Sequence, residues 1–250
     1  MILTGIDVGG SSIKGAPVDV ASGALTAPLV TVPTPTPATP AAAVGAIATV
    51  LAQLPADGPV GIAVPSVVKR GRTFTAANVD KSWIDANVEA LARDVLRRPV
   101  IVLNDADAAG IAEMRLGAGR DERGLALLLT FGTGIGSALF FDGRLVPNTE
   151  LGHLSLAGRE VEHFASGRVR TEERLGWPQW AERVNAVLAE FERLFWPDLF
   201  ILGGGVTECY EEFAPLLCAR ARIVPAHFRA QAGIVGAALA AERSSRGGLA

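Results

Sequence analysis

The spacing of hydrophobic and polar positions along the chain predicts an α/β protein. Short apolar runs rich in β-branched residues are typical of strands, and longer segments with apolar residues three and four positions apart are typical of amphipathic helices. The main predicted strands occupy residues 2–8, 60–64, 100–104, 125–130 and 199–202. Helical spacing covers residues 41–54, 88–96, 108–116, 178–196 and 231–243. Strands and helices therefore alternate, which favours sheets that contain parallel strands.

The chain carries one structural plan twice. The stretches that begin at Ile2 and at Leu125 each contain an apolar strand, a turn of glycine and hydroxyl residues, a second strand, and then Asp and Gly. The repetition predicts an internal duplication in which one copy opens each of two lobes. We expect the first lobe at residues 1–105 and the second at 106–230, with the helix at 231–243 as a candidate to complete the first.

Several local signals refine this outline. Residues 16–20 and 25–32 predict two further strands in the first lobe, and the proline-rich residues 33–40 predict a rigid loop within it. Ser82 is a candidate cap for the helix at 88–96, which Pro99 ends. The aromatic residues of the helix at 178–196 are expected to lie in the core rather than to form a stacking platform for bases.

Composition and charge restrict the function classes. The 250 residues suit one large domain or two lobes of roughly 100 to 130 residues each. Apolar residues make up 49% of the chain, which is enough for a sizeable core. The net charge of −3 argues against nucleic acid or a membrane surface as a general partner, although it allows a local basic groove.

The cysteines and the start of the chain indicate a cellular compartment. Cys209 and Cys218 form neither a CxxC pair nor a disulfide framework, so the sequence suggests a reducing environment in which both pack as small apolar groups. The first residues are too short and too uncharged a stretch for a signal peptide. No apolar run is long enough to span a bilayer. These observations predict a cytoplasmic protein.

One junction between a strand and a helix is the first candidate for chemistry. The strand at 100–104 stops at Asn104-Asp105, and the carboxyl ends of strands are where open α/β sheets bind ligands. Asp105 stands at a helix start, where the helix dipole favours its ionised form. A carboxylate held there could take a proton from a substrate hydroxyl. The simpler alternative is that Asp105 only caps the helix.

Three glycine-rich turns are candidates for binding phosphate. Backbone N–H groups can surround a phosphate only where no side chain blocks its approach. Gly9-Gly10-Ser11-Ser12 and Gly132-Thr133-Gly134 follow matched strands, and Gly203-Gly204-Gly205 closes a third. The first two turns match neither the GxxxxGK[ST] loop nor a dinucleotide fingerprint. Two turns in matched settings and a triple glycine together predict a phosphate-holding cleft.

Further polar residues suit a metal ion and a sugar. Asp7 precedes the first turn and could orient a hydrated Mg²⁺, the alternative being an Asp that only caps the turn. Glu150 and His153 lie three residues apart and could grip sugar hydroxyls, although a lone His is more often structural. The chain offers only His153, His163 and His227 beside distant cysteines, so a structural zinc site is not expected.

These motifs, taken in order, resemble those of the ROK family of sugar kinases, within the actin-like ATPase and hexokinase superfamily. The resemblance is carried by Asp7-x-Gly9-Gly10-Ser11-x-x-Lys14, Asn104-Asp105-Ala-Asp107-Ala-Ala, Thr130-x-Gly132-Thr133-Gly134-x-Gly136 and Glu150-x-Gly-His153. Residues 75–83 and 129–137 look most like the polyphosphate-using glucokinases of actinobacteria. The resemblance implies a ribonuclease H-like α/β fold of two lobes with a cleft between them, and a homodimer.

The resemblance also implies a role for each matching residue. Asp105 would be the general base for the glucose 6-hydroxyl. Glucose would be bound by Ser66, Asn78, Asn104, Asp105, Glu150, His153 and Glu162. The phosphoryl donor would lie against Gly9, Gly10, Ser11, Ser12, Lys14, Thr130, Gly132, Thr133, Gly134, Gly204 and Gly205. Asp7 would act through Mg²⁺. Many members carry a cysteine-rich zinc loop after the His, but residues 154–161 contain no cysteine, which implies no zinc and makes His153 a sugar contact.

The predicted function is transfer of a phosphoryl group to the 6-hydroxyl of glucose from inorganic polyphosphate, with ATP as a further candidate donor. Arg168, Arg170 and Arg174 could line a polyphosphate groove, although a solvated helix face explains their spacing more simply, and Arg70 and Arg72 are equally open candidates. The alternatives are an ATP-dependent glucokinase or glucomannokinase of the same family, a non-catalytic sugar sensor, and a structural actin-like ATPase.

Overall fold

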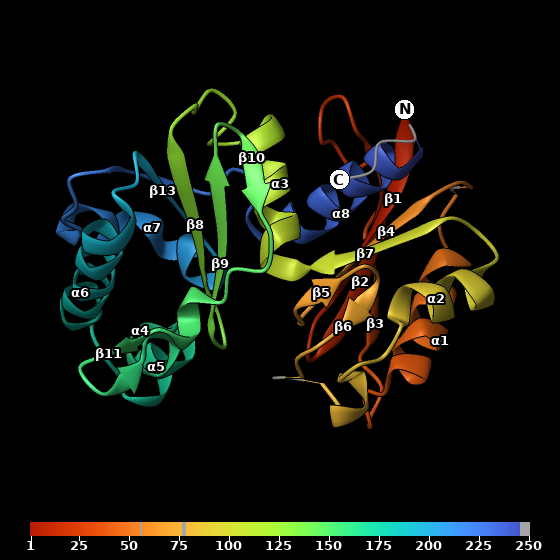
Figure 1. Cartoon of the computed structure of the whole chain (residues 1–250), viewed down its shortest axis with the longest axis horizontal. Helices are drawn as coiled ribbons and strands as arrows, with labels where there is room; N and C mark the ends of the chain where they lie inside the picture. The colour runs from red at the N-terminus through yellow and green to blue at the C-terminus, as the bar shows by residue number, and fades with distance from the viewer. Residues whose placement is uncertain (56, 77–78, 246–250) are drawn as a thin grey trace. The chain divides into compact units, whose positions relative to one another are not determined.

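The computed structural model describes residues 1–55, 57–76 and 79–245, with side chains up to residue 242 (Figure 1). Contacts divide the chain into two compact units. The first comprises Met1–Ala112 and the segment from Gln231 onward, and the second comprises Glu113–Ala230. Among the described helices, none is both long and apolar enough to cross a bilayer.

Each unit is built on a five-stranded mixed sheet with the same topology. The order in the first unit is β3-β2-β1-β4-β7, and the order in the second is β10-β9-β8-β13-β14. In both sheets the first three strands are antiparallel neighbours and the last three are parallel neighbours. The first sheet contains β1 (Ile2–Val8), β2 (Ser12–Asp19), β3 (Val30–Pro33), β4 (Val60–Val64) and β7 (Val100–Asn104). The second contains β8 (Leu125–Phe131), β9 (Ile135–Phe141), β10 (Arg144–Val146), β13 (Leu199–Gly203) and β14 (Arg222–Pro225). The repeated plan read from the sequence is therefore present in the fold.

The remaining elements connect and cover these sheets. The helices are α1 (Pro40–Leu51), α2 (Val88–Leu96), α3 (Asp105–Leu116), α4 (Val161–Ala165), α5 (Gly167–Glu172), α6 (Trp177–Phe195), α7 (Tyr210–Phe213) and α8 (Ala232–Ser245). Short 3₁₀ helices are η1 (Lys81–Trp83), η2 (Leu151–His153), η3 (Gly205–Cys209), η4 (Ala214–Leu216) and η5 (Arg229–Gln231). Two small hairpins pair β5 (Val68–Lys69) with β6 (Arg72–Thr73), and β11 (Ser155–Leu156) with β12 (Arg159–Glu160).

The sheet of the first unit is covered on both faces. Side chains of α1 and α2 pack with one face in a core that includes Ile47, Ile62 and Trp83. On the other face α8 lies directly against the strands, because Gly61 leaves room for its backbone. A Cβ atom on Gly61 would lie 1.8 Å from the carbonyl oxygen of Ala237. This close approach explains why the C-terminal helix belongs to the first unit.

Aromatic side chains of α6 form the centre of the second core. Trp180 is fully buried, its ring centroid lies 5.4 Å from that of Phe131 and 5.0 Å from that of Phe213, and its Nε1 donates to the carbonyl of Ala165 at 2.9 Å. A buried indole needs such a partner for its N–H group. The expectation that the aromatic residues of this helix lie in the core is confirmed for Trp180 and Phe191, which are fully buried, and for Phe195, which packs against the core. Trp196, at the end of the predicted range, is 67% exposed.

Three local predictions are wrong. The strand expected at residues 25–32 begins only at Val30, because Pro28 cannot donate to a ladder, and Leu25 makes a single bridge to Val18. Ser82 lies inside η1, and α2 is capped by Asn87, whose Oδ1 accepts from the Ala90 amide at 3.0 Å. Cys209 and Cys218 are free thiols on the surface rather than buried groups.

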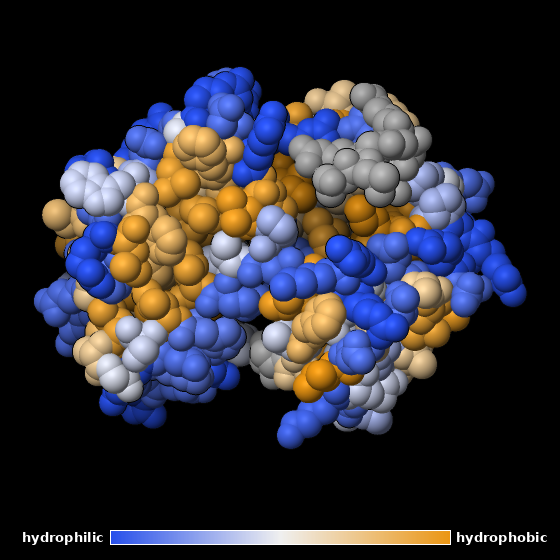
Figure 2. Space-filling view, in the orientation of Figure 1, coloured by the Kyte–Doolittle hydropathy of each residue, from blue (hydrophilic) through white to orange (hydrophobic). Residues whose placement is uncertain are grey.

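The view in Figure 2 adds one feature of the second unit's surface. Hydrophobic side chains gather over the part of this unit that holds β8 and β13 in Figure 1, and hydrophilic side chains border them. Phe141, which ends β9, is 63% exposed, and Val146, which ends β10, is 44% exposed. Because Phe141 pairs with Arg144, two residues before Val146, both apolar side chains share one face of this edge ribbon.

Candidate active site

Asp105 is the first residue of α3, directly after β7, and the side chain that caps this helix belongs to its neighbour. Asn104 is 6% exposed, and its Oδ1 accepts from the Asp107 amide at 2.9 Å. The Nδ2 group of Asn104 donates to the carbonyl of Ser66 at 3.3 Å. The Asp105 Oδ1 accepts from the adjacent Ala106 amide at 2.8 Å. The carboxylate is therefore held in the first turn, where the helix dipole stabilises its charge, while Asn104 does the capping.

Ser66 supports this junction from the end of β4. Its hydroxyl is buried and donates to the carbonyl of Thr75 at 2.8 Å. This hydrogen bond joins the two ends of the segment 66–75. The Ser66 carbonyl accepts from Asn104. The hydroxyl is thus engaged within the first unit. Asn78, the other residue expected to bind glucose from this segment, lies outside the described residues.

The first glycine turn joins β1 to β2 and is held by the proline-rich segment. The Gly9 amide donates to the carbonyl of Ser12 at 3.0 Å. Thr34 fixes the turn from outside: its hydroxyl donates to the Gly9 carbonyl at 2.6 Å and its amide donates to the Ser11 carbonyl at 3.1 Å. Gly10 and Ser11 are exposed at the tip. The proline-rich residues are therefore a structural part of this unit, as the sequence predicts.

Asp7 and Lys14 face each other across β1 and β2, next to this turn. They are directly paired in the strand register. Burial raises the pKa of Asp7 above its ordinary value, and the positive charge of Lys14 acts in the opposite direction. Gly233, in the first turn of α8, lies against the carboxyl group: a Cβ atom there would be 3.2 Å from the Asp7 Cγ. Asp7 is thus a desolvated carboxylate beside a phosphate-type turn.

In the second unit, the other two glycine turns meet at one pocket. Gly132, Thr133 and Gly205 line a cavity of about 350 Å³, together with residues of α5 and α6. Gly204 has φ of 85°, and a Cβ atom there would lie 2.4 Å from the carbonyl oxygen of Phe131. Only glycine fits this position. The adjacent parallel strands β8 and β13 thus bring together two turns that lie about seventy residues apart in the sequence.

Two guanidinium groups form part of the same pocket. The Arg168 amide donates to the Gly132 carbonyl at 3.0 Å, which places the start of α5 on the glycine turn. The Arg170 guanidinium lies 3.4 Å from the centre of the Trp177 ring, and the Phe213 ring stacks on Trp177 with a centroid distance of 5.3 Å. Arg174 is exposed and is not among the residues that line the cavity. Arg170 is therefore packed against Trp177 in the wall of the pocket, whereas Arg168 is exposed at the pocket with its Nε 4.0 Å from Glu172 Oε1.

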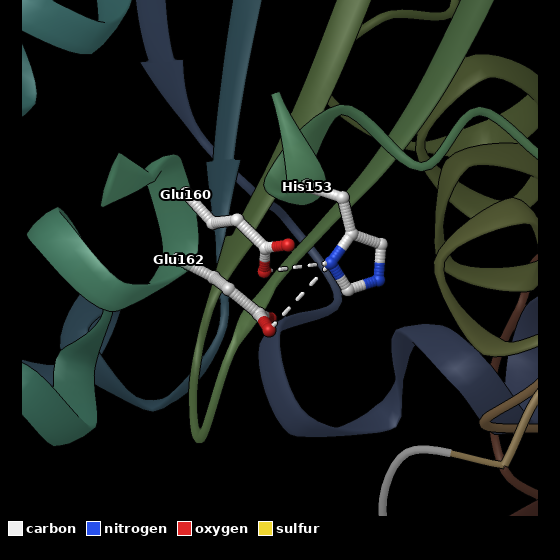
Figure 3. Close-up of side chains that lie close together, drawn as sticks. All are labelled: His153, Glu160 and Glu162. Atoms are coloured by element: carbon white, nitrogen blue, oxygen red, sulfur yellow. Dashed lines mark hydrogen bonds and ion pairs between the residues drawn. The ribbon is translucent and has the colours of Figure 1, made fainter. Parts of the chain in front are cut away.

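A cluster of carboxylates surrounds His153 in the second unit (Figure 3). Its Nδ1 lies 3.2 Å from Glu160 Oε2 and 3.8 Å from Glu162 Oε1, and its Nε2 lies 3.8 Å from Glu150 Oε2. Figure 3 shows Glu160 and Glu162 reaching the same edge of the ring. The predicted residues Glu150, His153 and Glu162 are therefore neighbours, although 12 positions separate the first from the last.

The main chain determines this arrangement. Gly152 lies against β9, where a Cβ atom would be 2.2 Å from the carbonyl oxygen of Ile135, so the Glu-x-Gly-His spacing needs glycine at this position. Ser137 accepts from the Leu151 amide at 3.0 Å and holds the start of η2. Glu162 lies in the first turn of α4. The proposed sugar-binding residues Glu150, His153 and Glu162 thus project from backbone segments that are fixed by these contacts.

The charges of the cluster shift two pKa values. Burial raises the pKa of Glu150, the nearby His153 opposes this, and Glu162 adds to it. For His153, burial is the largest single influence and lowers the pKa. The hydrogen bond with Glu160 and the charges of Glu162, Glu160 and Glu150 act in the opposite direction and together raise the pKa above its ordinary value.

Glu160 is the member of the cluster that the sequence analysis missed. It reaches His153 because the hairpin of β11 and β12 turns the chain back at Ala157 and Gly158, both with positive φ (50° and 81°). A two-residue turn ending in glycine between short polar strands is a recognisable hairpin signal. The motif Glu150-x-Gly-His153 ends before this turn, so it does not include Glu160.

Comparisons with known proteins identify the family and the fold. The sequence pattern that defines the ROK family matches residues 3–167. The fold is that of the actin-like ATPase superfamily, and the chain belongs to the ROK family.

Individual relatives are similar over nearly the whole chain. A polyphosphate glucokinase from Mycobacterium tuberculosis is 48% identical over 94% of this chain and 89% of its own length. The crystal structure of an inorganic polyphosphate/ATP-glucomannokinase from Arthrobacter sp. strain KM superposes with a TM-score of 0.93 at 46% identity, covering 97% of this chain and 99% of that one. A ROK family glucokinase from Streptomyces griseus, solved with glucose and AMPPNP, gives 0.83 at 25% identity, covering 97% of this chain and 100% of that one.

Proposed function

We propose that this protein is a glucokinase that transfers the terminal phosphoryl group of inorganic polyphosphate, and also that of ATP, to the 6-hydroxyl of glucose. The observation that carries the proposal is the contact between the two kinds of site in the second unit. Glu162, a candidate sugar ligand, lies against Gly134 of the glycine turn that borders the phosphate-type pocket. The names of the M. tuberculosis and Arthrobacter relatives support the same substrates.

Asp105 is the proposed general base. Its carboxylate accepts the proton of the glucose 6-hydroxyl while the sugar oxygen forms a bond to the terminal phosphorus of the donor. The bond between that phosphorus and its bridging oxygen breaks, and the shortened donor leaves with the electron pair. Such transfer depends mainly on positioning and on neutralising charge. The position of Asp105 in the first turn of α3 supports this role, because the helix dipole there favours the ionised carboxylate that accepts a proton.

In the second unit, Glu150, His153 and Glu162 are the proposed ligands of the glucose hydroxyls. In the first unit, Asn104 is a further proposed sugar ligand, with Ser66 acting through Asn104. The sequence resemblance adds Asn78. Carboxylates and imidazole together accept and donate hydrogen bonds, which suits a polyol with several hydroxyl groups. A pocket that leaves such groups unpaired when a hydroxyl is missing discriminates strongly between sugars.

In the second unit, the donor phosphates are proposed to bind in the pocket beside Gly132, Thr133 and Gly205. In the first unit, the turn from Gly9 to Ser12 and Lys14 are also proposed phosphate ligands. Two features of the pocket wall favour a chain of phosphates. Arg168 and Arg170 supply positive charge. The Trp177 ring is already engaged by protein groups, because the Arg170 guanidinium lies over the ring and Phe213 stacks on it, which makes it a poor platform for a nucleobase.

Asp7 is the proposed site for Mg²⁺, held through water. Mg²⁺ binds one or two carboxylates together with substrate phosphates and keeps several waters. The fit is supported by the desolvation of the Asp7 carboxyl group, since a nearby dication would favour its ionised form. The bound ion would neutralise charge on the phosphates.

We also propose a homodimer, in which a second copy of the chain would cover the exposed apolar face formed by Phe141 and Val146.

A donor-and-acceptor panel tests the proposal. Polyphosphate and ATP are each supplied with glucose and with mannose, and sugar phosphate is measured. We expect glucose 6-phosphate from polyphosphate. Product from ATP alone would assign an ATP-dependent glucokinase, and glucose binding without product from either donor would assign a sugar sensor. Light scattering measures the oligomeric state in the same buffers.

A further inference from the structure

We propose that Glu160 is a positioning residue that orients the His153 ring, so that the ring's Nε2 faces the sugar. This inference rests on the proposed function in one respect only, namely that His153 binds glucose. Glu160 itself is not among the residues expected to touch the sugar, and it acts through the imidazole.

The geometry of the contact distinguishes Glu160 from its neighbours. Its Oε2 lies 3.2 Å from His153 Nδ1, which is a hydrogen-bond distance. The carboxylates of Glu162 and Glu150 lie 3.8 Å from the two ring nitrogens, too far for a direct hydrogen bond. Figure 3 shows that the Glu160 contact ends on Nδ1, the nitrogen on the same side of the ring as Glu162. Glu160 is therefore the carboxylate that can fix the ring.

A hydrogen bond at Nδ1 determines what the other nitrogen can do. A carboxylate accepts but does not donate, so the proton of a neutral His153 resides on Nδ1. The Nε2 atom is then an acceptor for a sugar hydroxyl when the ring is neutral and a donor when the ring is protonated. Without Glu160 the ring can rotate and exchange tautomers. Orienting partners of this kind are general for functional histidines.

The cluster also contains the groups that compete for this proton. Glu150 precedes η2, Glu160 ends β12, and Glu162 and His163 lie in α4. His163 is the other imidazole, with Nδ1 3.5 Å from Glu160 Oε2 and Nε2 3.7 Å from Glu162 Oε1. It is more exposed than His153 (56% against 49%). The shorter contact of Glu160 is with His153, and the net effect of the three carboxylates is to raise the pKa of that ring.

The test is Glu160→Gln in the full-length protein, with a titration of the histidine rings followed by nitrogen-15 NMR and with steady-state kinetics for glucose. We expect the His153 pKa to fall and its Nδ1-protonated tautomer to lose population. The KM for glucose should rise about tenfold with kcat changed little, which is the size expected when a hydrogen bond to a charged group is lost. The pH dependence of KM should move to lower pH with the ring.

Three control variants separate the outcomes. Glu182→Gln changes an exposed carboxylate on α6 and should alter neither readout. Glu160→Asp should restore part of the tautomer preference. His153→Gln tests the proposed sugar contact by itself. If His153→Gln raises KM and Glu160→Gln does not, the positioning role is wrong and the proposed function stands. If His153→Gln leaves KM unchanged, the sugar role of His153 is wrong, whatever the NMR titration shows.

Two further results would overturn the inference. One is that Glu160→Gln shifts the pKa of His163 and leaves that of His153 in place. The other is a stoichiometric metal ion retained by the wild-type protein and lost in the variant, because atoms of His153, Glu160 and Glu162 all lie within 4.8 Å of one another. Melting temperatures of the variants, compared with the wild type, exclude loss of fold as the cause of either change.

Discussion

Gly134 and Glu162 are in direct contact: a Cβ atom placed on Gly134 would lie 2.2 Å from Glu162 Oε2. Gly134 belongs to the turn between β8 and β9, and Glu162 to the first turn of α4. In the proposed function, the turn that binds phosphate therefore also contacts Glu162, a proposed sugar ligand. The two halves of the proposed reaction share this one point of the second unit.

Gly134→Ala should therefore damage sugar binding without unfolding the protein. The new methyl group meets the far end of a flexible side chain, so Glu162 moves and the backbone does not. We expect the KM for glucose to rise about tenfold or more, equivalent to roughly 1.4 kcal/mol, with little change in melting temperature. Gly45→Ala, on α1 with no atom within 4 Å of the new group, is the matched control and should leave KM unchanged. An unchanged glucose KM in Gly134→Ala would contradict the contact.

Asp105→Asn should separate binding from chemistry. The amide keeps the shape of the carboxylate but cannot accept the proton of the sugar hydroxyl, so turnover should fall by about 10²- to 10⁴-fold. Glucose affinity, measured by calorimetry, should stay close to that of the wild type. If turnover remains normal, the base lies elsewhere, and Asp107, the buried neighbour in the same helix turn, is the next residue to replace.

Sequence patterns predicted the scaffold well because the signals there are local and periodic. The strand that begins at Ile2 and the hairpin at Asp142-Gly143 each depend on a run of neighbours, and both are present. The strand expected from Leu25 is wrong where Pro28 interrupts the run. Local patterns also indicated that a strand ends at Asn104 and Asp105, but they did not indicate which of the two residues caps the following helix. Two adjacent polar residues can each cap a helix, and only the hydrogen bond from the Asp107 amide identifies Asn104 as the cap.

The parts of the site that escaped prediction depend on contacts over long distances in sequence. Glu160 gains its meaning from a hairpin that folds it onto His153. Arg170, which the sequence spacing assigned to a solvated helix face, packs on the ring of Trp177, the first residue of α6. Cys209 is the last residue of η3, and it is exposed and lines the pocket instead of lying in the core. Composition alone indicates none of these contacts.

Arg168→Gln should weaken polyphosphate more than it weakens glucose. Removing one guanidinium from the pocket removes a charge-assisted contact to phosphate, so the KM for polyphosphate should rise about tenfold, and the salt dependence of that KM should decrease. Arg174→Gln is the matched control, since Arg174 is exposed in the same segment but does not line the pocket. Equal effects of the two replacements would mean that only the overall charge of the segment matters, which would remove the support for a donor site there.

Asp7→Asn should stabilise the fold and abolish the effect of Mg²⁺ on it. Burial raises the pKa of Asp7 above its ordinary value of 3.8, so the folded protein binds this proton more tightly than the unfolded chain does. The contribution of Asp7 to stability is therefore greatest below pH 3.8 and is lost as the pH rises through the folded-state pKa, which leaves a cost at neutral pH. Asparagine carries no such cost, so the melting temperature at pH 7 should be higher in the variant, and the difference from the wild type should shrink as the pH is lowered.

Added Mg²⁺ should raise the melting temperature of the wild type but not that of Asp7→Asn. Asp57→Asn, at an exposed position of the same unit, should behave like the wild type in both measurements. A lower melting temperature for Asp7→Asn at pH 7 would show instead that the attraction of the Lys14 charge outweighs the desolvation of the carboxylate.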